Sequence, residues 1–184
     1  PVSPNSLVAN FTTGTACAGS PVTFTDISSP AGSATTWAWD FNNDGTTDAN
    51  TQNPSHTFAA AGSYPVRLRI GSPPCIDDTV INVVVAALPT SSFTATAPVC
   101  EGADATITYT GSAPFNATYN WNFAGGTVTS GSGQGPYTIS WSSASIKNIS
   151  LTTSSNGCPS PSTTVPVTVH AVPVVSVSPD IAIC

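Results

Sequence analysis

Short runs in which apolar and polar residues alternate recur along the whole chain. They include residues 22–25, 37–41, 66–70, 106–110 and 165–169. A period of two places successive side chains on opposite faces of a strand, and the clusters of Gly, Pro, Asn and Ser between the runs are typical of turns. The pattern therefore predicts half-buried antiparallel strands and an all-β fold.

Composition supports this prediction and excludes several functions. Ser and Thr exceed a quarter of the 184 residues, and strong helix formers other than Ala are scarce. Three basic residues against nine acidic ones give a net charge of -6, which leaves no basic surface for nucleic acid or anionic lipid. No apolar run is long enough to span a membrane. Because the chain starts with Pro and contains no Met, we expect it to be a piece of a longer protein.

The spacing of the five cysteines indicates an internal repeat. Cys75 follows Cys17 at the same interval, about 58 residues, as Cys158 follows Cys100. The first cysteine of each unit recurs with a period of about 84 residues, at Cys17, Cys100 and Cys184. A tryptophan, Trp39 or Trp121, lies at nearly the same offset from the first cysteine of each unit. A period of this length predicts tandem domains rather than one core.

We place the domains at residues 1–87 and 88–172, with residues 173–184 as the first-strand stub of a third repeat. About seven short strands in each period fit a two-sheet β-sandwich. Aromatic residues that share one strand face, such as Trp37, Trp39 and Phe41, are expected in the core. An exposed aromatic platform for sugars is the alternative, for which Tyr137 and Trp141 are the better candidates.

Equal cysteine spacing in a Ser/Thr-rich chain favours two disulfides, Cys17 to Cys75 and Cys100 to Cys158, and an oxidising compartment. A zinc site is the competing interpretation, but the sequence has no CxxC and only two histidines. By the same interval, the partner of Cys184 is expected further along a longer chain. Here Cys184 is therefore expected to be a free thiol or an intermolecular bridge.

Residues 37–70 carry a family resemblance. This segment resembles the PKD domain, a β-sandwich family with a W-D-F core and a later N-P-x-H segment. The matching residues are Trp39, Asp40 and Phe41, then Asn53, Pro54, His56 and Phe58, and then Gly62, Tyr64, Val66 and Leu68. Asn42 replaces the Gly of the family motif, and the following loop is longer. The resemblance covers about residues 5–87.

The second unit resembles a more divergent PKD-like or Ig-like domain, with residues 121–128 where the motif would be and no NPxH segment. The fold class is thus all-β, with tandem Ig-like/PKD β-sandwich domains. Repeats of this kind resemble those of very long secreted surface proteins of Bacteroidetes-type bacteria, including gliding-motility adhesins. The resemblance implies an extracellular, cell-surface array secreted by that group's own outer-membrane route.

The turn after the W-D-F segment is a candidate calcium loop in the first domain only. Asp40, Asn42 and Asp44 occupy positions 1, 3 and 5, Gly45 position 6 and Asp48 position 9, and the Thr46 carbonyl supplies another oxygen. Position 12 is Thr51 rather than Glu, so the last ligand is missing. The alternative is a plain hairpin turn, for which Asn-Asp-Gly is a good sequence.

No catalytic motif is found, and we expect no enzyme. His56 is expected to be structural, and no GxSxG nucleophile elbow occurs. The leading hypothesis is a non-enzymatic extracellular module of a large bacterial adhesin, acting as spacer or in adhesion or gliding. Its partners would be neighbouring repeats and a surface glycan or protein ligand. The alternative is an accessory substrate-binding module of a secreted polysaccharide- or protein-degrading enzyme.

Overall fold

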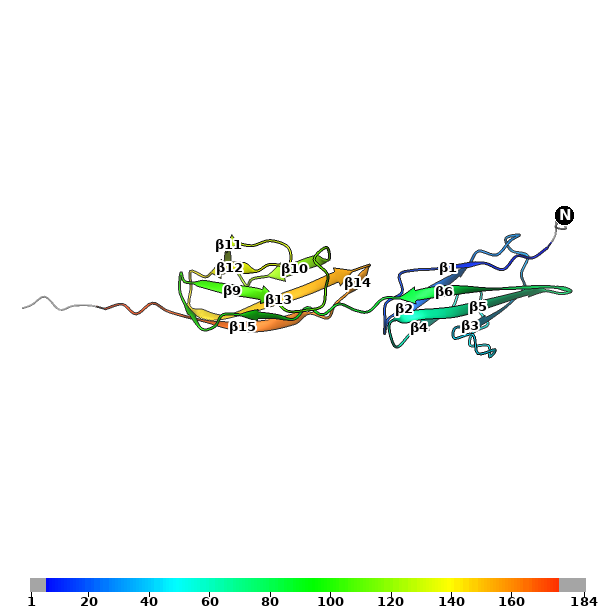
Figure 1. Cartoon of the computed structure of the whole chain (residues 1–184), viewed down its shortest axis with the longest axis horizontal. Helices are drawn as coiled ribbons and strands as arrows, with labels where there is room; N and C mark the ends of the chain where they lie inside the picture. The colour runs from blue at the N-terminus through cyan, green and yellow to red at the C-terminus, as the bar shows by residue number, and fades with distance from the viewer. Residues whose placement is uncertain (1–5, 176–184) are drawn as a thin grey trace, which may run out of the picture. The chain divides into compact units, whose positions relative to one another are not determined.

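The computed structural model describes residues 6–175, and every regular element in this range is a β-strand (Figure 1). The predicted all-β class is confirmed. The expectations for most of the third-repeat stub, Cys184 included, lie outside the described residues. Within residues 6–175 no helix is long and apolar enough to cross a membrane.

The chain divides into two compact units. The first comprises Pro1–Leu88 together with the short segment Asn156–Cys158, and the second comprises Pro89–Ser155 and Pro159–Cys184. No local pattern in the sequence indicates that residues 156–158 group with the first unit.

The first unit is built from two three-stranded sheets. One has the order β1-β2-β4, with β1 Phe11–Thr13, β2 Pro21–Asp26 and β4 Ser55–Thr57. The other has the order β3-β5-β6, with β3 Thr36–Asp40, β5 Gly62–Ser72 and β6 Cys75–Val85. All pairings within these two sheets are antiparallel.

Aromatic rings fill the core of the first unit. Trp39 is completely buried, and its ring meets Phe11 edge-on at 5.1 Å and Phe24 at 5.5 Å between centroids. Alternate residues of β5, namely Val66, Leu68 and Ile70, are buried in the same cluster. The alternation in the sequence therefore gives the correct inward face of β3 and β5.

The second unit also contains two sheets. One has the order β11-β12-β9-β7, with β7 Phe93–Ala95, β9 Asp104–Tyr109, β11 Thr127–Ser130 and β12 Tyr137–Ser140. The other has the order β10-β13-β15-β8, with β8 Val99–Cys100, β10 Thr118–Asn122, β13 Ser145–Ser155 and β15 Thr163–His170. The short strand β14, Cys158–Pro159, pairs with β13.

Tyr137 and Trp141 belong to the core of the second unit. Their exposed fractions are 9% and 2%, and the Trp141 indole N–H donates to the Phe123 carbonyl at 2.9 Å. Gly126 packs so closely against Trp141 that a side chain there would collide with the indole ring. The hypothesis that Tyr137 and Trp141 form an exposed platform for sugars is therefore wrong.

Shortening Leu68 should destabilise the first unit. Leu68 is completely buried in β5, so Leu68→Ala is expected to cost about 2–5 kcal/mol of unfolding free energy. Val84→Ala is the matched control, because Val84 is 74% exposed on the neighbouring strand and its truncation should change stability by less than about 0.5 kcal/mol. Urea unfolding followed by Trp fluorescence measures both, and equal losses would contradict the assigned core.

Candidate functional site

The Asp40 carboxylate organises the loop that follows β3. It is 5% exposed, and its two oxygens accept hydrogen bonds from the backbone N–H groups of Asp44, at 3.1 Å, and Gly45, at 2.8 Å. Gly45 has a φ of 90°, which favours glycine at this position. The carboxylate thus ties the far side of the loop back to the end of the strand.

The other candidate ligands take part in the same turn. Asp48 Oδ2 accepts a hydrogen bond from the Phe41 N–H at 2.7 Å. Asn42 Nδ2 donates to Asp44 Oδ2 at 2.9 Å, and Asp44 Oδ1 accepts from the Thr46 N–H at 2.7 Å. These bonds, the Thr46 N–H first and the Asn42 amide second, hold the pKa of Asp44 below its ordinary value.

This arrangement fits a self-supporting turn better than a calcium cage. Calcium takes six to eight oxygens around one point, whereas here the oxygens of Asp40 and Asp48 face backbone N–H groups. Among the described residues, no group of three or more His, Cys, Asp or Glu is placed to hold a metal ion. In this conformation hydrogen bonds within the turn engage the Asp40 and Asp48 carboxylates, and calcium binding stays a prediction for experiment.

His56, on β4, is a packing residue beside this loop. Its ring stacks on Phe41 at 4.2 Å and meets Phe58 edge-on at 4.7 Å. Burial lowers the pKa of His56, and the nearby Asp48 charge opposes that shift only in part. The NPxH histidine thus contributes its ring to the aromatic cluster beside this loop.

Asp26 and Asp77 have structural roles that the sequence does not reveal. Asp26 accepts hydrogen bonds from the Trp37 indole at 2.8 Å and from the Ser28 N–H at 2.9 Å. Burial alone would raise the pKa of Asp26, but these hydrogen bonds outweigh it and keep the pKa low. Asp77 accepts from the Ala9 N–H at 2.7 Å. In the sequence both resemble solvated turn acids. Most of their hydrogen-bond donors are distant in sequence, so only the structure reveals them.

The structure contradicts the expected disulfide pairing. Cys17 bonds to Cys158, with Cα atoms 5.6 Å apart and a sequence separation of 141. Cys75 and Cys100 are free and exposed. The predicted Cys17–Cys75 and Cys100–Cys158 bridges are therefore absent from the described residues.

Strand geometry explains why the expected bridges do not form. Cys17 lies beside Ala86, just beyond the end of β6, whereas Cys75 is the first residue of that strand. Eleven residues at about 3.3 Å each separate the two by roughly 35 Å, while a disulfide needs Cα atoms within about 7 Å.

The second unit repeats this separation. Cys100 pairs with His170 at one end of β15, next to the start of β13. Cys158 follows the opposite end of β13, which is 11 residues long. Equal sequence spacing therefore reflects two equivalent positions in a sandwich and not two bonded partners.

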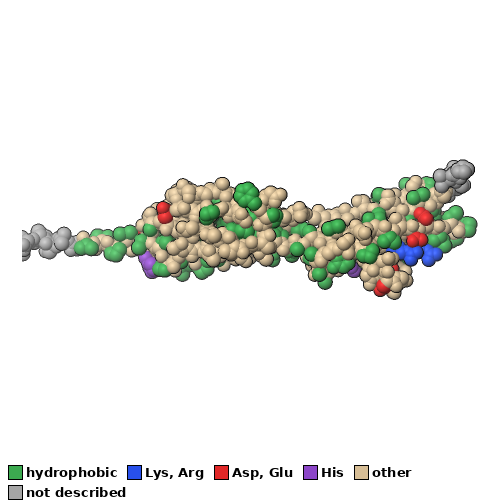
Figure 2. All heavy atoms as spheres, in the orientation of Figure 1, with side chains coloured by type: hydrophobic (Ala, Val, Ile, Leu, Met, Phe, Trp, Pro, Cys, Tyr) green, Lys and Arg blue, Asp and Glu red, His purple; other side chains and the backbone are tan. Residues whose placement is uncertain are grey.

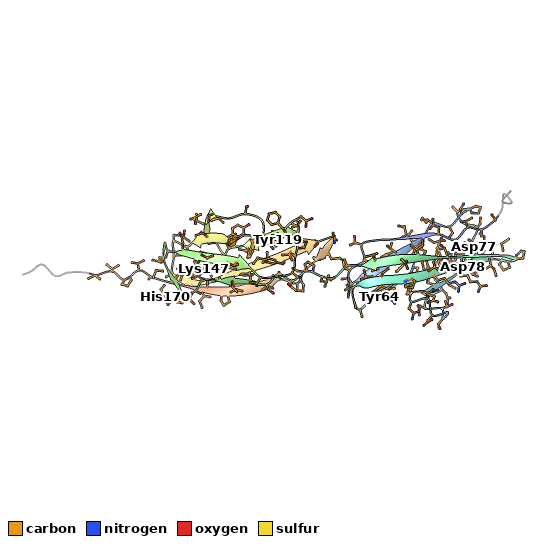
Figure 3. All side chains as sticks on the ribbon, viewed as in Figure 1. Tyr64, Asp77, Asp78, Tyr119, Lys147 and His170 are labelled. Carbon is orange, nitrogen blue, oxygen red and sulfur yellow. A yellow bond between two sulfur atoms is a disulfide. The ribbon has the colours of Figure 1, made fainter. Side chains whose placement is uncertain are left out.

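Both arginines of the first unit lie on the outer face of β5. Arg67 Nε pairs with Asp78 Oδ2 on β6 at 2.9 Å, and Arg69 is exposed. They line a small hollow of about 70 Å³ together with Thr46 and other residues. Figure 2 shows the blue guanidinium groups beside red carboxylates on this unit. Figure 3 labels Asp77 and Asp78 on β6.

A comparison with known families gives the class of the first unit. A family model described as the PKD domain matches residues 6–78, so a PKD domain is found in the chain. This match ends within β6 and does not extend into the second unit. No curated protein matches the chain.

Three solved structures illustrate what the chain is similar to. The PKD1 domain of Vibrio anguillarum Epp is 26% identical, and the match covers 45% of this chain and 96% of that one with a TM-score of 0.39. The fibronectin(III)-like modules of Clostridium thermocellum CbhA are 17% identical, with coverage of 89% and 95% and a TM-score of 0.45. Carbohydrate-binding modules of the β-sandwich superfamily are 15% identical, with coverage of 82% and 55% and a TM-score of 0.41.

Replacing Asp40 should destabilise the first unit without any metal. Asp40→Asn weakens two backbone hydrogen bonds to a buried acceptor, and we expect a loss of about 1–3 kcal/mol in the presence of chelator. Thermal unfolding by circular dichroism measures it. An unchanged melting temperature in chelator would contradict the role of Asp40 as the organiser of the turn.

Calcium makes a separate prediction in the same experiment. If the loop binds calcium with a dissociation constant near 10⁻⁴ M, about 2 mM calcium should add roughly 2 kcal/mol to the first unit. Asp44→Ala should abolish that gain, because Asp44 is a predicted ligand on the exposed side of the loop. Identical melting curves with calcium and with chelator would rule the calcium site out.

Acidification should weaken the first unit through His56. The folded pKa lies below the ordinary value of 6.5, so this contribution to stability is complete above pH 6.5 and is lost as the pH falls through the folded pKa. Melting temperatures measured from about pH 7.5 to about pH 5 should therefore fall less steeply for His56→Gln than for the parent chain. His170→Gln is the control, since His170 is exposed at the end of β15 (Figure 3), and should keep the parental slope.

Proposed function

We propose that this chain is a non-enzymatic extracellular repeat module of a large bacterial cell-surface adhesin, serving as a spacer that carries a binding tip away from the cell. The PKD domain at residues 6–78 supports an extracellular module. On this proposal both units are repeats of one array, and the array takes part in adhesion or gliding motility.

The disulfide is the observation that carries the proposal. Cys17 and Cys158 are 6% and 0% exposed, so their bond is part of the packed interior. Structural disulfides form and persist in oxidising environments outside the bacterial cytoplasm. In the chain-entropy model a bond that closes a loop of this length, with a sequence separation of 141, stabilises the fold by about 5 kcal/mol. Such a module is suited to the cell exterior.

The surface also favours a spacer. Ligand pockets in proteins usually hold about 300–1,000 Å³. Over the described residues, hollows of about 70 and about 230 Å³ fall below that range, and one of about 370 Å³ lies at its lower end. Most large aromatic side chains point into the two cores. A spacer requires a stable body and no deep binding site.

One surface feature favours the alternative, an accessory substrate-binding module of a secreted degradative enzyme. A hollow of about 230 Å³ on the sheet β3-β5-β6 is lined by Trp37, Arg69 and Ile76, among others. An aromatic edge beside an exposed guanidinium could hold an acidic sugar or a peptide carboxylate. The hollow is smaller than most ligand sites, which places this function second.

A binding assay separates the two functions. The chain is mixed with cellulose, chitin, alginate and collagen, and the bound fraction is measured after sedimentation. A spacer should remain in solution with all four. Retention on one of them by the parent chain, and its loss in Arg69→Gln, would favour the accessory module. Arg67→Gln is the matched control, because Arg67 is already paired with Asp78.

A further inference from the structure

The first cysteine of each period occupies the same structural position. Cys17 is followed by a turn in which the Ser20 N–H donates to the Cys17 carbonyl at 3.1 Å, with Gly19 at a φ of 72°. Cys100 is followed by the same turn, in which the Ala103 N–H donates to the Cys100 carbonyl at 3.0 Å, with the intervening glycine at a φ of 74°.

The neighbouring strand completes this equivalence. Cys17 forms a parallel bridge to Ala86 at the end of the last strand of the first unit. Cys100 pairs in parallel with His170 at the end of β15, the last strand of the second unit. The two first cysteines are therefore equivalent in hydrogen bonding as well as in the sequence period.

Cys75 and Cys158 match each other in the same way. Cys75 begins β6 after a turn that follows the 11-residue strand β5. Cys158 begins β14 after a turn that follows the 11-residue strand β13. Each is the first strand residue after the turn that ends a long strand.

The observed bond connects the two kinds of position across the sequence period. Cys17 is the first cysteine of one period, and Cys158 is the second cysteine of the next period. Among residues 6–175, the rule that this bond follows leaves one unpaired position of each kind, namely Cys100 and Cys75, and both are exposed thiols. A hollow of about 370 Å³ lies beside Cys75, lined by Leu7 and Pro73 among others.

From this pattern we infer that Cys100 and Cys75 are the open ends of a disulfide ladder. Cys100 bonds to the second cysteine of the repeat that follows it in the same polypeptide, and Cys75 bonds to the first cysteine of the repeat that precedes it. Cys100 would thus bond as its equivalent Cys17 does, and Cys75 would bond as its equivalent Cys158 does. This goes beyond the spacer function, which would stand without such bonds.

The bond forms by thiol–disulfide exchange with a small disulfide such as oxidised glutathione. The thiolate of one cysteine attacks a sulfur of the oxidant, forming a mixed disulfide and releasing one glutathione thiolate. The thiolate of the second cysteine then attacks the protein sulfur of the mixed disulfide and releases the second glutathione. The two protons lost by the cysteines are taken up by the two glutathione thiolates, and the oxidant is reduced by two electrons.

A tandem chain tests the ladder directly. Two copies of residues 6–172 are joined head to tail, which gives Cys100 of the first copy and Cys75 of the second copy almost the same sequence separation, 141, as Cys17 and Cys158. In the test variant, Cys75→Ser in the first copy and Cys100→Ser in the second leave only the predicted pair. After oxidation with a glutathione buffer, non-reducing peptide mapping should find the Cys75 peptide linked to the Cys100 peptide in the monomer.

The reverse variant is the matched control. Cys100→Ser in the first copy and Cys75→Ser in the second leave the two thiols that the ladder assigns to absent neighbours. These thiols should remain free and react with iodoacetamide. Both variants should retain the Cys17–Cys158 peptide, which reports that each copy has folded.

Three results would overturn the ladder while the Cys17–Cys158 peptide is present. The first is a Cys100 thiol that stays alkylatable in the test variant. The second is an equal yield of linked peptide in the two variants. The third is a link found only in covalent dimers, which would assign the free thiols to separate molecules. None of these results would contradict the spacer function, which the binding assay tests independently.

Discussion

The register of the long hairpin formed by β5 and β6 determines most of the first unit's architecture. Eleven consecutive pairs join Gly62–Ser72 to Cys75–Val85. Because side chains alternate between faces, this register places Leu68 in the core and Arg67 on the outer face beside Asp78. It also places the first residue of β6, a cysteine, at the far end of the sheet from its expected partner. Core, charged surface and cysteine chemistry therefore all follow from one strand pairing.

The second unit reaches a similar result with a different interior. Trp141 and Tyr137 lie in its core, whereas Phe24 lies among the aromatic rings of the first core. Ile149 and Leu151, alternate residues of β13, are buried in the same way as alternate residues of β5. The two units share the backbone positions at the strand ends, where the cysteines lie, although several of their core residues differ. A repeat can change its interior and still present its thiols at the same places.

The sequence is sufficient to predict the all-β class and the inward faces of β3 and β5, because alternation of period two is a local signal. It is also sufficient to find the PKD motif from Trp39 to Leu68. The sequence does not determine the cysteine pairing, because equal spacing is compatible both with a bond inside one repeat and with a bond to the next repeat. The burial of Trp141 and most of the donors to Asp26 and Asp77 depend on contacts between distant segments, which no local pattern records.

The Cys17–Cys158 bond also changes how the chain would carry a mechanical load. When the polypeptide is pulled on both sides of this bond, tension passes from Cys17 directly to Cys158 through the sulfur atoms. Residues 18–157 lie outside that path and cannot be drawn out, even if their strands separate. At about 3.4 Å per residue, the bond prevents the extension of roughly 480 Å of polypeptide. A thread built in this way would stay short under shear and would lengthen only after reduction.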